Sequence, residues 1–106
     1  MTTEMTIYPE QRKEIVRQIG QMNVLSISGG RVTSLADGIE LPVSNGYRVR
    51  VRLTPMDTYT VQRVFVRSGK ESIKGERTNV FCDEVSEAAY HAGMFRSYDE
   101  KEWVTK

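Results

Sequence analysis

The sequence is poor in the side chains that most enzyme chemistry needs. Among its 106 residues there is one cysteine, Cys82, and one histidine, His91. A lone cysteine cannot form an internal disulfide, which indicates a protein made and kept in a reducing cytoplasm. No apolar run approaches the ~18 residues that span a bilayer, and the N-terminal residues lack the basic start and apolar stretch of a secretory signal. We therefore expect no membrane association.

The scarce reactive groups form no recognisable catalytic or metal site. Glu87 lies one helical turn before His91 and could pair with it, but these two residues and Cys82 match no metal-binding spacing. The "SGK" at residues 68–70 resembles a phosphate-binding loop only in part, because the required earlier glycine is Val64. We predict that the protein is not an enzyme and that it has no cofactor and no metal.

The net charge is small, but charge is distributed unevenly along the chain. The net charge is +1, yet residues 44–78 hold eight basic and three acidic residues, and residues 79–102 hold six acidic and two basic ones. The first segment is thus +5 and the second −4. Such a dipolar layout bears on partner choice and encounter rate, and it also allows self-association.

The pattern of apolar and turn residues predicts one α+β domain over residues 1–106. A helix is expected over residues 9–19, with Pro9 in its first turn and Gly20 as its C-terminal cap. A second is expected over residues 84–95, capped by Asp83 and apolar on one narrow face. Between them we expect a twisted antiparallel sheet of four to six strands. Its strands are sought among residues 24–28, 31–35, 39–43, 47–53, 58–67, 70–76 and 79–82.

Glycine pairs and the two ends complete the expected layout. Gly29-Gly30 predicts a tight turn that joins the strand at 24–28 to its neighbour, and Asn45-Gly46 is the strongest hairpin signal in the chain. The ends, residues 1–8 and 98–106, are expected to be loosely ordered, with Trp103 as a conceivable anchor. The order of residues 1–8 stays open at this level.

Parity decides which way the arginines of "GYRVRVRL", residues 46–53, are directed. If Val51 lies opposite Val61, one face of the hairpin is almost wholly apolar, and Arg48, Arg50 and Arg52 occupy the other. A slip of one residue would turn the arginines toward the core, at a cost of several kcal/mol for each unpaired guanidinium. We therefore expect all three arginines to reach water, and Arg50→Glu to leave folding nearly intact.

The strand at residues 39–43 conflicts with this arrangement. A two-residue turn at Asn45-Gly46 would pair Leu41 with Arg50 and place the apolar residues of 39–43 on the arginine side. Either a bulge near Pro42 redirects this strand, or residues 39–43 partly cover the arginine face.

A basic sheet face is the candidate binding surface. Its residues are predicted to be Arg48, Arg50, Arg52, Arg63, Lys70 and Lys74. Forked guanidinium groups suit phosphates, so the face could bind nucleic acid, although no exposed aromatic residue is expected beside it. It could equally bind an acidic protein surface, or it could be a solvated face with no ligand. A third alternative is a small ligand or nucleotide held between sheet and helix.

Several strings in the chain resemble a known group of proteins. The runs "MNVLSISGGR" (22–31), "LPVSNGYRVRV" (41–51), "DTYTVQRVFVR" (57–67) and "FCDEVSEAAYHAGMFR" (81–96) resemble a family of small uncharacterised proteins encoded by actinobacterial phages and prophages. The resemblance covers residues 15–97. It implies a protein made in the host cytoplasm of an infected bacterium, with an accessory role, but it transfers no functional residue. The leading hypothesis is non-catalytic binding to a host or phage protein, with a homo-oligomer as a further option.

Overall fold

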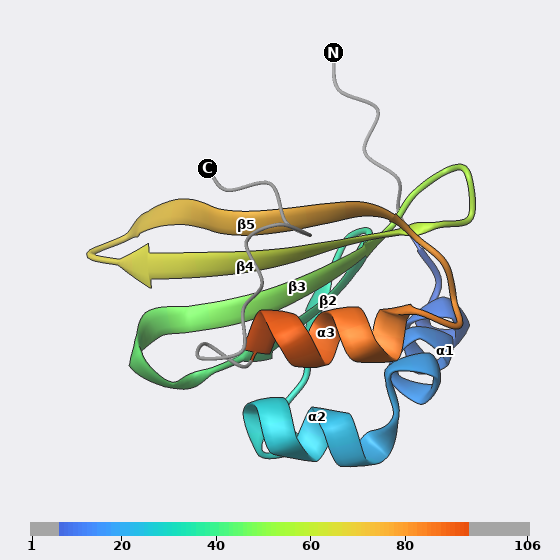
Figure 1. Cartoon of the computed structure of the whole chain (residues 1–106), viewed down its shortest axis with the longest axis horizontal. Coiled ribbons are helices and arrows are strands. Elements are labelled where there is room, and N and C mark those ends of the chain that lie inside the picture. The colour runs from blue at the N-terminus through green and yellow to red at the C-terminus, as the bar shows by residue number, and fades with distance from the viewer. Residues whose placement is uncertain (1–6, 94–106) are drawn as a thin grey trace.

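The computed structural model describes residues 7–93 and shows an α+β fold. Its order is α1 (Pro9–Ile19), α2 (Gln21–Ser28), β1 (Thr33–Leu35), β2 (Gly38–Pro42), the 3₁₀ turn η1 (Ser44–Gly46), β3 (Tyr47–Leu53), β4 (Tyr59–Arg67), β5 (Lys70–Val80) and α3 (Val85–Gly93). The strands form one antiparallel sheet in sequential order, β1 to β5. The three helices gather on one side of this sheet (Figure 1). The predicted fold class is confirmed.

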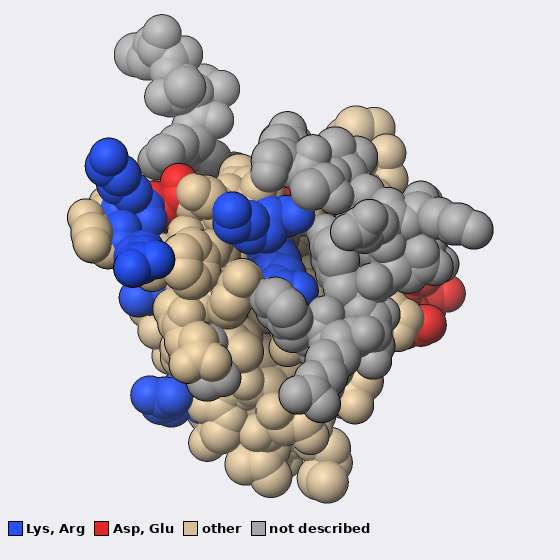
Figure 2. All heavy atoms as spheres, turned by 60° about the vertical axis from the view of Figure 1, so that its left-hand side comes forward, with Lys and Arg blue, Asp and Glu red and all other residues tan. Residues whose placement is uncertain are grey.

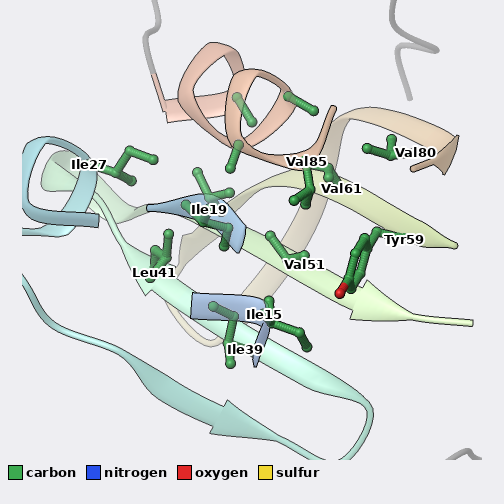
Figure 3. Close-up of a cluster of buried hydrophobic side chains, with 14 of the residues drawn as sticks. Ile15, Ile19, Ile27, Ile39, Leu41, Val51, Tyr59, Val61, Val80 and Val85 are labelled. Carbon is green, nitrogen blue, oxygen red and sulfur yellow. The ribbon is translucent and has the colours of Figure 1, made fainter. Parts of the chain in front are cut away.

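The core lies between the sheet and the helices. Ile15 and Ile19 of α1 are fully buried and lie between the helices and the strands, close to Leu41 and Val51 (Figure 3). Helix α1 has the predicted bounds, with Pro9 in its first turn and Gly20 capping its end. From α3 the core takes only small side chains, which lets this helix lie close to the sheet. These residues are Val85, Ala88, Ala89 and Ala92.

The central hairpin has the register that parity predicted. Val51 pairs with Val61, Leu53 with Tyr59, and Tyr47 with Phe65. Because successive strand residues point to opposite faces, the aliphatic residues of β3 enter the core and its three arginines occupy the far face. We call this far face, turned away from the helices, the outer face.

A three-residue loop resolves the conflict at residues 39–43. Val43 donates its backbone N–H to Tyr47, and η1 carries the chain between them, with Asn45 at φ 64°. This adds one residue to the expected two-residue turn, so Glu40 pairs with Arg50 and Leu41 pairs with Val49. The shift by one position sends Leu41 into the core and Glu40 to the outer face.

The prediction of a strand at residues 24–28 is wrong. These residues lie in α2, which starts after Gly20 and ends at Gly29, a left-handed cap with φ 67°. The alternation of apolar residues favoured a strand. Val24 and Ile27 are three residues apart, however, so a helix places both on one face, and both are buried. Gly29 therefore ends a helix and does not turn a hairpin.

The C-terminal elements differ in detail from the prediction. Strand β5 is a single strand of 11 residues, where two short segments were expected. Its pairing with β4 contains register shifts. Helix α3 begins at Val85, so Glu84 and not Asp83 directly precedes it, and the Glu84 carbonyl accepts the N–H of Ala88. The Glu84 carboxylate accepts the backbone N–H of Phe81 at 3.2 Å, in the turn before the helix. Residues 94–106, with Trp103, lie outside the described residues, as do residues 1–6, whereas Ile7 is buried and donates its N–H to Ala36.

Candidate functional site

Arg50 is the centre of a group of ion pairs on the outer face. Its Nε donates to Oε1 of Glu40 on β2 at 2.7 Å. Its two terminal nitrogens donate to both oxygens of Glu71 on β5, at 3.0 and 2.7 Å. The side chain of Arg50 is only 12% exposed and that of Glu40 only 6%, so this pair is largely withdrawn from water.

The neighbouring arginines are paired in the same way. Nη1 of Arg48 donates to Oε2 of Glu40 at 3.0 Å, so Glu40 receives one hydrogen bond on each oxygen. Arg52 donates to Oδ1 of Asp37 at 2.7 Å and to the side-chain oxygen of Gln62 at 3.2 Å. We call the whole group the outer-face network. Its members are Asp37, Glu40, Arg48, Arg50, Arg52, Gln62, Glu71 and Glu76, the last accepting a hydrogen bond from Gln62 at 2.7 Å.

These contacts shift the protonation equilibria in the direction that strengthens the pairs. Hydrogen bonds from Arg50 lower the pKa of the Glu71 carboxyl, and the positive charge of Arg50 adds to this. The bonds to Glu71 raise the pKa of the Arg50 guanidinium, against a smaller opposing effect of burial. Both groups therefore stay charged at neutral pH.

The outer face is less basic than the sequence predicted, and its role as a binding surface stays a prediction. Arg48, Arg50 and Arg52 share it with four carboxylates, so the outer-face network has one more negative than positive charge. The acidic residues lie on other strands, Glu40 ten residues before Arg50 and Glu71 twenty-one after it, and only strand pairing brings them together. The expectation that Arg50→Glu leaves folding intact also changes, because the new carboxylate would face Glu40 and Glu71.

The other three predicted site residues do not join this network. Arg63 pairs with Val49, lies on the helix side of the sheet and is buried, with its guanidinium 4.5 Å from the centre of the Tyr47 ring. Lys74 is directed to the same side, 6.0 Å from the Phe65 ring. Lys70 is exposed and opens β5.

Basic side chains are scattered over the surface seen in Figure 2, which brings the β4–β5 turn forward. The Lys and Arg residues there form separate groups, divided by uncharged residues. Nucleic-acid binding with its usual affinity needs several adjacent phosphate contacts. The described residues on the face seen in Figure 2 do not form a continuous row of such contacts.

The scarce reactive residues form no cluster of three among the described residues. His91 lies 3.9 Å from Glu87, as the helical spacing predicted, and Cys82 is exposed beyond the end of β5. Within residues 7–93, no three His, Cys, Asp or Glu side chains are placed to hold a metal ion. No helix in that part of the chain is both long and apolar enough to cross a bilayer.

Helix α2 presents a surface that the sequence reading missed. Met22, Leu25, Ser26 and Gly29 recur at helical spacing and are all exposed, with Met22 74% and Leu25 55% accessible. We call these four residues the α2 stripe. A signal was present in the sequence, because residues 20–30 contain no charged side chain, but it was hidden by the assignment of this segment to a strand.

The opposite side of α2 holds the helix in place. Val24 and Ile27 are buried, and the side-chain amide of Asn23 donates to Ser86 Oγ of α3 at 2.5 Å. At the C-terminal end of the helix the surface is hollowed by a pocket of about 430 Å³. Its walls include Ser26 and Gly29 of the α2 stripe, together with Arg31, Pro42 and Val43.

Comparison with protein-family models, with curated proteins and with solved structures found no match to this chain.

Proposed function

We propose that the protein acts without catalysis, by binding another protein through the α2 stripe. The observation that carries this proposal is the uncharged surface helix: Met22 and Leu25 are more than half exposed in a segment with no charged residue. Centres of protein interfaces are depleted in charge and enriched in methionine. An apolar helix face that no other described residue covers is a typical docking site.

The hollow beside α2 supports this role. A pocket next to an exposed apolar stripe can receive an anchoring side chain from a partner, and such anchors supply much of the binding energy in interfaces. Ser26 and Gly29 lie both in the α2 stripe and in the pocket wall, so the two features are continuous. The partner would then cover the stripe and fill the pocket together.

The resemblance to phage and prophage proteins suggests where the partner is found. It favours a host or phage protein in the cytoplasm of an infected bacterium. The outer-face network does not favour the alternative of a nucleic-acid binder, because its arginines are paired within the chain. A second copy of the chain is the other possible partner, and the test separates the two.

The test compares Met22→Glu/Leu25→Glu with Met56→Glu. Met56 is 82% exposed in the β3–β4 turn and provides a matched apolar-to-acidic change away from α2. Exposed changes of this kind cost within ~0.5 kcal/mol, so all variants should fold, which circular dichroism checks. Tagged proteins are used to capture partners from a lysate of the producing cells, and captured proteins are identified by mass spectrometry.

We expect the wild type and Met56→Glu to retain the same protein, and the α2 variant to lose it. Light scattering on the purified chain tests the second-copy alternative, in which the wild type is a dimer and the α2 variant a monomer. Equal capture by all three proteins would refute docking at α2. A monomeric wild type that captures nothing would refute protein binding as the function.

A further inference from the structure

A groove lies between α1 and the edge strand β1. Unlike the uncharged α2 stripe, it is lined in part by basic residues. It has a volume of about 290 Å³ and a mostly apolar lining. We call it the α1–β1 groove. Its lining residues are Arg12, Lys13, Val16, Val32, Ser34 and Ile39. Val32 and Ser34 are exposed and Ile39 is buried, so the groove is open toward the edge strand and closed toward the core.

The strand beside this groove has an open edge. Strand β1 is the first of the sheet and pairs only with β2 among the described residues. A two-residue turn joins Leu35 to Gly38, so these two residues form a hydrogen-bonded pair. Hydrogen-bonded and non-hydrogen-bonded pairs alternate along an antiparallel ladder, so the next pair, Ser34 and Ile39, is a non-hydrogen-bonded pair. Ser34 therefore directs its backbone N–H and C=O outward, where an added strand could use them.

The rim of the groove is cationic. Nε and Nη2 of Arg12 both donate to the backbone oxygen of Leu35, at 3.1 and 2.7 Å, which fixes the guanidinium beside β1. Lys13 is exposed, and no carboxylate lines the groove. Glu14, the next residue along α1, is held by Arg17 and Gln18. The groove thus presents positive charge next to an apolar floor.

We propose that the α1–β1 groove binds an extended peptide segment that carries an apolar side chain and, two residues away, a carboxylate, so that both side chains face α1. The backbone of the segment would pair with Ser34, its apolar side chain would lie over Val16 and Val32, and its carboxylate would meet Lys13. The site is independent of the α2 stripe.

The first experiment selects ligands without assuming a sequence. A library of random decapeptides, displayed on a carrier, is selected against the immobilised full-length protein. We expect enriched peptides to carry Asp or Glu near an aliphatic or aromatic residue. Absence of enrichment, or enriched peptides without acidic residues, would overturn the proposal.

The second experiment locates the selected peptide. Lys13→Glu and Val32→Glu should each weaken its binding by about tenfold or more, since repulsion or a buried charge replaces a favourable contact. Lys70→Glu and Met56→Glu are the matched controls at exposed positions outside the groove, and they should leave affinity unchanged. Equal effects of groove and control variants, or none, would contradict the site.

A backbone measurement tests the strand addition itself. Hydrogen exchange of the Ser34 amide, which is directed outward, should slow when the peptide is bound. The α2 variant should bind the peptide as the wild type does, which keeps this inference separate from the proposed function. Binding that leaves the Ser34 amide unprotected would overturn pairing with β1.

Discussion

Arg50 on β3 donates two hydrogen bonds to the carboxylate of Glu71 on β5, across the intervening strand β4. Fork-to-fork geometry of this kind makes the strongest arginine–carboxylate contacts. On the other side, Arg50 holds Glu40 of β2, so one guanidinium connects three strands. The arginines of β3 therefore serve in large part to hold neighbouring strands of the sheet together.

Removing Arg50 should destabilise the protein more than removing Glu71. In Arg50→Met the buried carboxylate of Glu40 keeps only the partly exposed Arg48. Removing one partner of a buried pair costs about 3–5 kcal/mol. Glu71 is half exposed, so its ion pair is screened by water and Glu71→Ala should cost clearly less. Urea unfolding measures both. In the control, Glu40→Gln/Arg50→Met should be more stable than Arg50→Met alone, and the reverse order would contradict a buried ion pair.

Acid should reduce the contribution of Glu71 to the free energy of unfolding. The pKa of Glu71 is lowered in the folded protein, so its stabilising effect is complete above the unfolded value of about 4.3. It is lost as the pH falls through the folded pKa, because the carboxyl must then be protonated in both states. The difference in unfolding free energy between wild type and Glu71→Gln should shrink from pH 6 toward pH 2. A difference that stays constant over this range would contradict the pairing.

Tyr59 should titrate only at strongly alkaline pH. Burial is the main cause that raises its pKa to about 12, and its hydroxyl donates to Gln18 at 2.6 Å. An ordinary tyrosine has a pKa of about 10. Because the folded pKa is raised, the associated stability is present below pH ~10 and is lost as the pH rises toward 12. Absorbance titration at alkaline pH should show one late step that is missing in Tyr59→Phe.

Gly38 should not tolerate a side chain. A Cβ at this position would lie 1.9 Å from the backbone oxygen of Val51 and 2.8 Å from Cα of Arg52. Backbone atoms of a central strand cannot move aside cheaply, so Gly38→Ala should cost about 3 kcal/mol or more. Ser34→Ala, in the same hairpin but exposed, is the control and should be nearly neutral. Comparable thermal stability of the two variants would refute the close approach of β2 and β3.

Nucleic-acid binding should be weak and little affected by the arginines of β3. With these charges paired in the chain, the logarithm of the binding constant should fall with the logarithm of salt concentration with a slope of magnitude below about two. Fluorescence anisotropy with single- and double-stranded DNA measures this slope from ~50 mM salt upward. A steep slope that disappears in Arg48→Ala/Arg52→Ala would restore the nucleic-acid hypothesis.

Local rules explain why part of the fold was predictable. Pro9 and Gly20 set the bounds of α1 because each has a special role at a helix end. Parity set the register of β3 and β4 because a slip would bury arginines and expose valines. In both cases the interactions that decide the structure are made within one helix or one hairpin, between residues that are close in the sequence as well as in space.

Residues 24–28 show where such rules fail. Their β-branched and alternating residues favour a strand, but α1 and α3 offer a surface on which Val24 and Ile27 can both be buried from a helix. A short apolar segment takes the secondary structure that its tertiary neighbours bury best. The exposed stripe on α2 became visible only with that assignment.

The sequence alone determined that Arg48, Arg50 and Arg52 lie opposite the core, since alternation along a strand is a property of the backbone. It could not determine what these arginines meet. The added residue of the η1 turn brought Glu40 beside Arg50, and the β4–β5 hairpin carried Glu71 to its other side. Which charges neutralise one another depends on distances between strands, and those distances exist only once the whole sheet has formed.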